Sequence, residues 1–140
     1  MANMKVEVIV FRLDPAVEIL LLHRPASRGG IWQPVTGKVE KGETVLEGAL
    51  RELKEETGID EEHIMRIIDN VYSFDFTDGN VENKEEVFGV EVDADTVVDI
   101  SKNIYVEHDR FEWMAPEKAE SAMFWSTNVS ALKKLIEKIR

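Results

Sequence analysis

The chain has 140 residues, of which 44% are hydrophobic and 32% charged, with a formal net charge of −11 and no cysteine. This length and composition predict one folded domain over residues 1–140 and exclude a disordered chain or a disulfide-stabilised one. The acidic charge disfavours a nucleic-acid-binding protein, and the lack of cysteine restricts metal sites to oxygen and histidine ligands.

Targeting segments are not evident in the sequence. Residues 1–11 lack a basic stretch followed by a long apolar run, so no signal peptide is predicted. No apolar stretch is long enough to span a bilayer. We therefore expect a cytoplasmic protein that binds neither a membrane nor nucleic acid.

The first part of the chain is predicted to be mostly extended. β-Branched and other apolar residues fill residues 4–13 and 17–23, which predicts two strands. Asp14-Pro15 is a turn signal between them. Residues 26–30 are predicted to form a loose loop, and residues 31–39 an extended segment.

The clearest helix is predicted over residues 44–57. Thr44 and Glu47, three residues later, form a capping box, and Gly58 is a stop signal. Gly48 in mid-helix costs about 1 kcal/mol relative to alanine. On a helical wheel of about 3.6 residues per turn, one apolar stripe is expected to face the core, and it consists of Val45, Leu46, Ala49, Leu50 and Leu53.

The second half of the chain continues with strands and ends in a helix. Alternation predicts a strand over residues 71–76, with Tyr72, Phe74 and Phe76 on one side, and Asp78-Gly79 predicts a hairpin turn. The remaining predictions are a strand at 87–92, a short strand at 112–114, a short helix at 116–122, and an amphipathic helix at 128–139 with the stripe Val129, Leu132, Ile136 and Ile139. Strands mixed with a few helices predict an α/β or α+β layered domain.

Three carboxylates gather on one side of the predicted helix: Glu52, Glu55 and Glu56. Like charges at this spacing repel by a few tenths of a kcal/mol per pair. A bound divalent cation would reverse the sign of that effect, and oxygen ligands suit Mg²⁺ or Mn²⁺. The alternative is a solvated acidic face with Arg51 and Lys54 as partners.

Residues 37–59 read GKVEKGETVLEGALRELKEETGI. This segment matches the Nudix box, G-x5-E-x7-R-E-U-x-E-E-x-G-U with U aliphatic, at every fixed position. Those positions are filled by Gly37, Glu43, Arg51, Glu52, Leu53, Glu55, Glu56, Gly58 and Ile59. The chain therefore resembles the Nudix hydrolase family, which implies an α/β fold, an α/β/α sandwich with a central mixed β-sheet.

The resemblance also implies roles for the residues of the box. Glu43 and Arg51 are expected to form a structural ion pair that braces the loop against the helix. In the family, water attacks a phosphorus of an X-linked nucleoside diphosphate while metal ions polarise the phosphate oxygens. The expected metal ligands are the carbonyl of Gly37 and the carboxylates of Glu52, Glu55 and Glu56. These three glutamates are also the expected catalytic residues.

A narrower similarity concerns the bacterial dihydroneopterin triphosphate (dATP) pyrophosphohydrolases. It rests on residues 32–44, 106–113 and 125–128, which read WQPVTGKVEKGET, VEHDRFEW and WSTN. It implies that Glu107 is a further catalytic carboxylate, either a metal ligand or a general base. The alternatives are that Glu107 is an ordinary surface acid, or that Glu112 or Glu91 takes this role.

Candidates for substrate binding lie before the box. Arg24 is suited to holding a phosphate, although a surface arginine at a strand end is the alternative. Trp32 and Gln33 are expected to contact a base or pterin by stacking and hydrogen bonding. For Trp32, packing in the core is the alternative. The histidines His23, His63 and His108 lack metal-ligand spacing, and we assign them no role.

The resemblance predicts an enzyme that hydrolyses a nucleoside or pterin triphosphate to the monophosphate and pyrophosphate. A second hypothesis is a dinucleoside polyphosphate hydrolase acting on diadenosine tetraphosphate. A catalytically silent binding module ranks last, because such modules should have lost box carboxylates and this chain keeps all of them. Both a monomer and a homodimer are compatible with the family.

Overall fold

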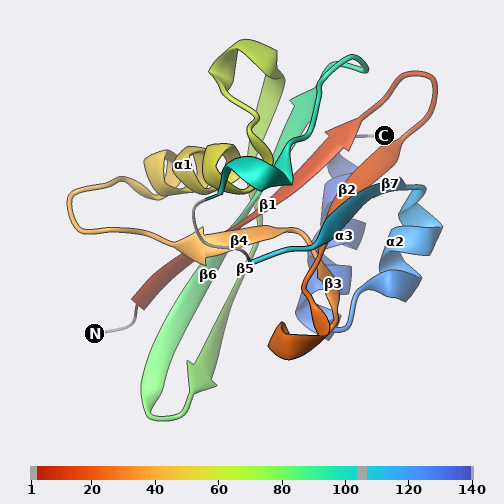
Figure 1. Ribbon diagram of the computed structural model, residues 1–140. Coiled ribbons are helices and arrows are strands. Elements are labelled where there is room, and N and C mark those ends of the chain that lie inside the picture. Colours follow the sequence, from red (N-terminus) through yellow and green to blue (C-terminus); the bar gives the residue numbers. More distant parts are fainter. Residues whose placement is uncertain (1–2, 104–106, 140) are drawn as a thin grey trace.

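A mixed β-sheet lies between helix α1 on one face and helices α2 and α3 on the other (Figure 1). The computed structural model describes residues 3–103 and 107–139. The strands are β1 (Asn3–Arg12), β2 (Glu18–His23), β3 (Trp32–Gln33), β4 (Val35–Lys38), β5 (Ile64–Asp78), β6 (Val81–Val92) and β7 (Arg110–Met114). The helices are α1 (Val45–Thr57), α2 (Pro116–Ala122) and α3 (Ser126–Ile139), with short 3-10 turns at Ala26–Arg28, Glu61–His63 and Ile100–Lys102. The predicted α/β/α sandwich with a central mixed sheet is confirmed.

Strand β1 is the centre of the sheet. It runs parallel to β6 along most of its length. On its other side, residues 5–8 pair antiparallel with β4, whereas β2 pairs only with Phe11 and Arg12. Strand β2 then pairs with β3 and β7. The sheet therefore divides beside β1 into one branch that holds β4 and another that holds β2, β3 and β7.

The core has two layers because successive residues of β1 point to opposite faces. Val6 and Val10 pack in the layer beneath α1. Ile9 and Phe11 pack in the layer beneath α3. A strand that is buried on both faces requires a nearly continuous apolar run, which explains why this strand was predictable from its composition.

The ends of α1 follow the predicted signals. The hydroxyl of Thr44 accepts a hydrogen bond from the backbone N–H of Glu47, and the Glu47 carboxylate accepts one from the N–H of Thr44. Gly58 closes the helix with a φ of 74°, in the left-handed region that favours glycine. Both signals are local in sequence, so they specify the helix boundaries independently of the rest of the fold.

The predicted apolar stripe of α1 is wrong at Leu46, which is 39% exposed. The buried face instead turns toward Gly48. A Cβ atom on Gly48 would lie 3.2 Å from Val39 Cγ2 and 3.3 Å from Glu43 Oε1. The glycine therefore lets the loop before the helix pack closely against it, which accounts for a residue that weakens the helix itself.

Strands β5 and β6 form a hairpin that is longer than predicted. The turn at Asp78-Gly79 is confirmed, but β5 begins at Ile64 and β6 at Val81. The pairing is irregular between Ile68 and Tyr72, and Asn70 has a positive φ of 51° there. This bulge, together with the exposure of the outer half of the hairpin, interrupts the alternation on which the prediction relied.

The C-terminal elements agree with the predictions. The short strand extends to Arg110–Met114, the short helix spans Pro116–Ala122, and the last helix spans Ser126–Ile139. The predicted stripe of α3 faces the sheet, with Leu132 fully buried and Val129, Ile136 and Ile139 partly buried. Leu135, which the stripe did not include, is fully buried on the same side. Across the described residues, none of the helices has the length and apolar character needed to cross a membrane.

Helix α3 packs unusually closely on β6 at Gly89. A Cβ atom on Gly89 would lie 2.5 Å from Leu135 Cδ1. The glycine leaves room for the leucine side chain, so α3 and β6 meet at a position where a larger residue is excluded.

We predict that Gly89→Ala lowers the free energy of unfolding by about 1–3 kcal/mol, the usual cost of overpacking a core. In a Leu135→Ala background, the same substitution should cost much less, because the clashing methyl groups are absent. Urea unfolding of both single variants and of the double variant measures this coupling. Additive effects of the two substitutions would contradict the proposed contact.

Candidate functional site

Three of the box carboxylates, Glu52, Glu55 and Glu56, occupy the last two turns of α1 but differ in their exposure. The side chain of Glu55 is 50% exposed, that of Glu52 15%, and that of Glu56 1%. They therefore form a row that runs from solvent into the edge of the core. The sequence predicted that these residues are neighbours, and the helix confirms it.

Glu56 is the buried end of this row. Neither of its carboxylate oxygens has a hydrogen-bond partner among the residues that the structure describes. Burial raises the pKa of Glu56 well above its usual value, and Glu52 and Glu107 raise it further. The backbone N–H of Thr36 lies near enough to lower this pKa, but this is the smallest of these effects and the contact is not a full hydrogen bond. A buried carboxylate without donors is costly, so this position favours a bound positive charge.

Gly37 on β4 lies directly against the carboxylate of Glu52. A Cβ atom at Gly37 would overlap the Glu52 side chain, including its Cδ and Oε2 atoms. Only glycine allows this approach, which brings the main chain of β4 next to the carboxylates of α1. The carbonyl predicted as a metal ligand and the predicted carboxylates therefore lie in one place.

The predicted brace between Glu43 and Arg51 is present. Arg51 Nε donates to Glu43 Oε2 at 2.7 Å, and Arg51 Nη2 donates to Glu43 Oε1 at 3.0 Å and to the carbonyl of Lys38 at 2.8 Å. Arg51 Nη1 also donates to Glu52 at 2.8 Å and to Glu55 at 3.2 Å. These bonds lower the pKa of Glu43 and raise that of Arg51. One guanidinium thus joins the loop, β4 and α1.

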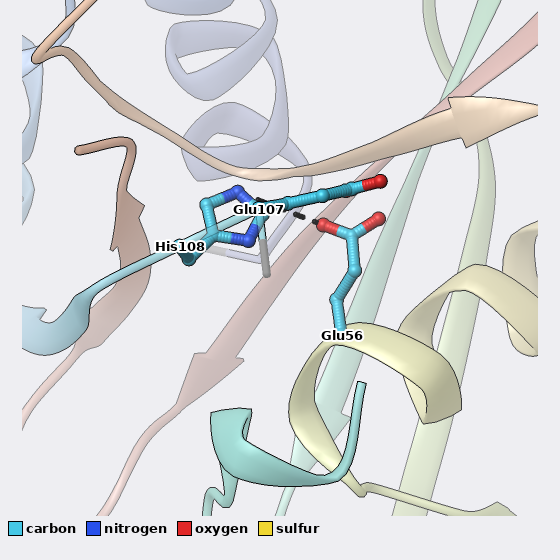
Figure 2. Close-up of side chains that lie close together, drawn as sticks. All are labelled: Glu56, Glu107 and His108. Atoms are coloured by element: carbon cyan, nitrogen blue, oxygen red, sulfur yellow. Dashed lines mark ion pairs between the residues drawn. The ribbon is translucent and has the colours of Figure 1, made fainter. Parts of the chain in front are cut away.

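Glu107 approaches the carboxylate row from the opposite side, on the segment that precedes β7. Figure 2 shows Glu56 reaching from α1 toward Glu107 and its neighbour His108. One ligand atom from each of these side chains lies within 4.8 Å of the others. Burial raises the pKa of Glu107, and so does Glu52, while Arg28 and Arg24 lower it. Val106, the first residue of the similar stretch, lies outside the described residues.

His108 is a candidate that the sequence analysis left without a role. Its Nε2 atom lies 3.9 Å from Glu56 Oε1, and the side chain is buried. Burial lowers its pKa to about 4, with a further contribution from Arg24 and Arg28. The imidazole is therefore neutral near pH 7 and can serve as a ligand or hydrogen-bonding group. Spacing gave no signal for it, because its partner Glu56 is distant in sequence.

Two of the predicted substrate-binding residues, Gln33 and Arg24, lie at one edge of this cluster, and Trp32 does not. Gln33 is buried, and its Nε2 atom is 3.5 Å from His108 Nε2. Arg24 acts electrostatically on both Glu107 and His108. Trp32 is half-buried and packs in the layer beneath α3, with the His23 ring 4.8 Å away. Core packing therefore accounts for much of the Trp32 surface.

The rival acids have other partners. Glu91 pairs with Arg66 at 3.0 Å, and Glu112 pairs with Lys118. Both alternate with residues of the core layer beneath α1, so their side chains lie on the α3 face of the sheet. Glu107, by contrast, lies beside Glu56 and raises its pKa.

The donor set fits a divalent cation. The buried oxygens of Glu56 lack hydrogen-bond donors among the described residues. A side chain at position 37 would fill the space beside the Glu52 carboxylate. Carboxylate and carbonyl oxygens are the ligands that Mg²⁺ and Mn²⁺ prefer.

A comparison with protein families identifies this arrangement. The NUDIX domain model matches residues 4–135. The chain belongs to the Nudix family. The box residues, the α1 helix that carries them and the sandwich around them are therefore the Nudix fold and its characteristic segment.

Curated relatives match the chain over different lengths. The dihydroneopterin triphosphate diphosphatase of Escherichia coli (strain K12) is 28% identical over 141 residues, which covers 92% of this chain and 89% of that protein. The Haemophilus influenzae protein of the same name is 30% identical over 149 residues, covering 99% and 90%. An octanoyltransferase of Myxococcus xanthus is 36% identical over 104 residues, or 71% of this chain. The chain spans only 27% of that protein and 31% of Nudix hydrolase 10 of Arabidopsis thaliana.

Solved structures agree on the fold. A diadenosine tetraphosphate (Ap4A) hydrolase of Caenorhabditis elegans in a binary complex superposes with a TM-score of 0.84 at 22% identity, covering 99% of this chain and 98% of that chain. The E. coli dihydroneopterin triphosphate pyrophosphohydrolase superposes with a TM-score of 0.80 at 24% identity, covering 99% of both. At this identity the similarity establishes the Nudix fold alone.

We predict that Glu56→Gln and Glu43→Gln differ in their effects on thermal stability and on its response to MgCl₂. Glu56→Gln should melt in EDTA at a temperature no lower than that of the unsubstituted chain, because burying an amide costs less than burying an unpartnered carboxylate. It should also lose most of the stabilisation by MgCl₂ and lower kcat by orders of magnitude. Glu43→Gln should lower Tm in both buffers, because glutamine cannot replace both charge-assisted bonds to Arg51.

Thermal melts with EDTA and with MgCl₂, alongside steady-state kinetics, measure these differences. If both variants melted alike and responded equally to MgCl₂, this would contradict the brace formed by Arg51 and the metal site at Glu56.

Proposed function

We propose that this chain is a Mg²⁺-dependent pyrophosphohydrolase that converts a nucleoside triphosphate or dihydroneopterin triphosphate to the monophosphate and pyrophosphate. The observation that carries the proposal is the cluster around Glu56, where carboxylates from α1 meet Glu107 from a separate segment. Dihydroneopterin triphosphate diphosphatases that match 92% and 99% of the chain support the choice of substrate.

The residues that would hold the metal are Glu52, Glu55 and Glu56 together with the carbonyl of Gly37. A bound Mg²⁺ or Mn²⁺ would supply positive charge where phosphoryl oxygens become more negative in the transition state. Glu43 and Lys38 hold the Nε and Nη2 atoms of Arg51, and its Nη1 atom donates to Glu52 and Glu55 at the side of the proposed metal site. Its function is to keep the loop and helix aligned.

Glu107 is proposed to accept a proton from the attacking water. Carboxylates from one helix face only one side of a phosphate, whereas Glu107 approaches from the segment before β7. Its raised pKa, caused chiefly by burial, makes its carboxylate a better proton acceptor than an exposed acid. Direct metal ligation by Glu107 is compatible with the same geometry.

The substrate is proposed to extend from the carboxylates toward Arg24, Trp32 and Gln33. Arg24 supplies a positive charge close to Glu107, in a position that suits a phosphate oxygen. Gln33 is buried beside His108 and offers an amide for hydrogen bonding to the substrate. Because Trp32 is largely engaged in packing, we assign it a wall of the binding site rather than a full stacking platform.

Two alternatives receive less support. A dinucleoside polyphosphate hydrolase is favoured by the superposition on the C. elegans Ap4A hydrolase, but at 22% identity that match concerns the fold. A silent binding module would not need the complete set of box carboxylates that this chain retains.

We predict that pyrophosphate release from dihydroneopterin triphosphate and dATP requires Mg²⁺ or Mn²⁺ and stops with EDTA. Both substrates should exceed diadenosine tetraphosphate in kcat/KM. A panel with phosphate and pyrophosphate detection measures this. Activity in metal-free buffer would overturn the metal requirement, and a preference for diadenosine tetraphosphate would favour the alternative enzyme.

We also predict that Glu107→Gln lowers kcat by about tenfold or more, the lower range for loss of a general acid or base. Glu112→Gln and Glu91→Gln are matched controls, because both acids pair with cations on the α3 face, and they should change kcat little. Steady-state kinetics at saturating MgCl₂ compare the three variants. A wild-type kcat for Glu107→Gln would remove Glu107 from the mechanism.

A further inference from the structure

His23 ends β2 at the point where this strand meets both β3 and β7. It pairs with Trp32 of β3 on one side and with Arg110 of β7 on the other. Cross-strand partners carry their side chains on the same face of a sheet. The His23 ring accordingly lies 4.8 Å from the Trp32 ring, and the guanidinium carbon of Arg110 lies 5.5 Å from the centre of the Trp32 ring. These contacts fix the imidazole, whose side chain is only 12% exposed.

Both ring nitrogens of His23 contact the segment that leads into β7. Nδ1 donates to Asp109 Oδ1 at 2.7 Å, and Nε2 lies 3.4 Å from the donor Nη2 of Arg110. The ring tautomer with its proton on Nδ1 satisfies both contacts. The main chain adds a third bond, because the N–H of Asp109 donates to the His23 carbonyl at 3.0 Å. The hydrogen bond from His23 lowers the pKa of Asp109, which is therefore a carboxylate near pH 7.

The residue between Glu107 and Asp109 is also held against the sheet. His108 is buried, and its Nε2 atom lies 3.5 Å from Gln33 Nε2 on β3. Residues 108, 109 and 110 thus each contact β2 or β3. Glu107 comes directly before this anchored run, and its described neighbours act on its carboxylate through burial and charge. The position of that carboxylate therefore depends on the main chain that follows it.

The path from the His23 contact to the carboxylate cluster is short. Glu107 precedes Asp109 by two residues, which span at most about 7 Å of main chain. One carboxylate oxygen of Glu107 lies within 4.8 Å of ligand atoms of Glu56 and His108 (Figure 2). A general base has to lie within hydrogen-bond distance of the attacking water, so a displacement of about 1 Å is enough to lower the rate by up to about 100-fold.

We propose that His23 and Asp109 are positioning residues, which hold the segment before β7 so that the Glu107 carboxylate faces Glu56 and the attacking water. The inference rests on the proposed function, in which Glu107 accepts a proton from that water. His23 and Asp109 act through the main chain of residues 107–109 and not on the reacting atoms. Asp109 also raises the pKa of His108 through its charge, so a purely electrostatic role is the alternative that the experiments separate.

The first experiment separates position from charge by steady-state kinetics with dihydroneopterin triphosphate and MgCl₂. His23→Ala and Asp109→Ala should each lower kcat by about tenfold with little change in KM, because a displaced base is missed mainly in the transition state. Asp109→Asn removes the charge but keeps an oxygen acceptor for His23 Nδ1, and should lose less than about twofold. His63→Ala, at a histidine beside the exposed acid Glu62, is the matched control and should leave kcat unchanged. Equal losses in Asp109→Ala and Asp109→Asn, or no loss in either, would overturn the proposal.

The second experiment tests whether the effect passes through Glu107. In a Glu107→Gln background, His23→Ala and Asp109→Ala should lower kcat by about twofold at most, because moving a residue that no longer accepts a proton has little further effect. Losses that multiply with that of Glu107→Gln would show an independent role and overturn this inference alone. A chain that hydrolysed no triphosphate would instead remove the proposed function together with this inference.

The third experiment does not depend on catalysis. Amide hydrogen exchange in EDTA measures how firmly the N–H of residue 109 is held against the His23 carbonyl. Asp109→Ala should speed exchange at this amide by about tenfold, the equivalent of one hydrogen bond, while Asp109→Asn should speed it less. Exchange of the Gly58 N–H, which donates to Lys54 at the end of α1, should not change and reports that the variants are folded. Unchanged exchange at residue 109 in a folded Asp109→Ala variant would contradict the anchoring role.

Discussion

The guanidinium of Arg51 is the interaction on which the site depends. It donates to Glu43 in the loop, to the carbonyl of Lys38 in β4, and to Glu52 and Glu55 on its own helix. Without this cation, the loop and the carboxylate row would repel each other across a short distance. Because the bonds run to three elements, one side chain sets the position of α1 against β4.

Close packing at two glycines makes that geometry possible. Gly37 allows the main chain of β4 to reach the Glu52 carboxylate, and Gly48 allows the loop to reach α1. Gly48 also weakens the helix itself, and Glu56 adds a buried carboxylate without a hydrogen-bond partner among the described residues. Stability is thus given up at the position where a divalent cation is proposed to bind, as is common at functional sites.

Two adjacent residues of β1, Val6 and Glu7, face opposite sides of the sheet, and each side holds a buried acid. Val6 lies opposite Gly37 and faces α1, whereas Glu7 lies opposite Thr36 and faces α3. Each face holds a buried acid whose pKa burial raises, Glu56 on one side and Glu7 on the other. Opposite faces of this one strand pair therefore each lie beside a buried acid.

The sequence by itself determined the elements whose signals are local. The capping box at Thr44 and the glycine at position 58 specify α1, and its 3.6-residue period brings Glu52, Glu55 and Glu56 together, because these effects act within a few residues. The irregular half of β5 and the exposure of Leu46 depended on partners elsewhere in the chain. Only the tertiary structure decided that His108 meets Glu56 and that Glu7 meets Asn128, since residues so far apart in sequence become neighbours through strand order and helix packing, which no local pattern encodes.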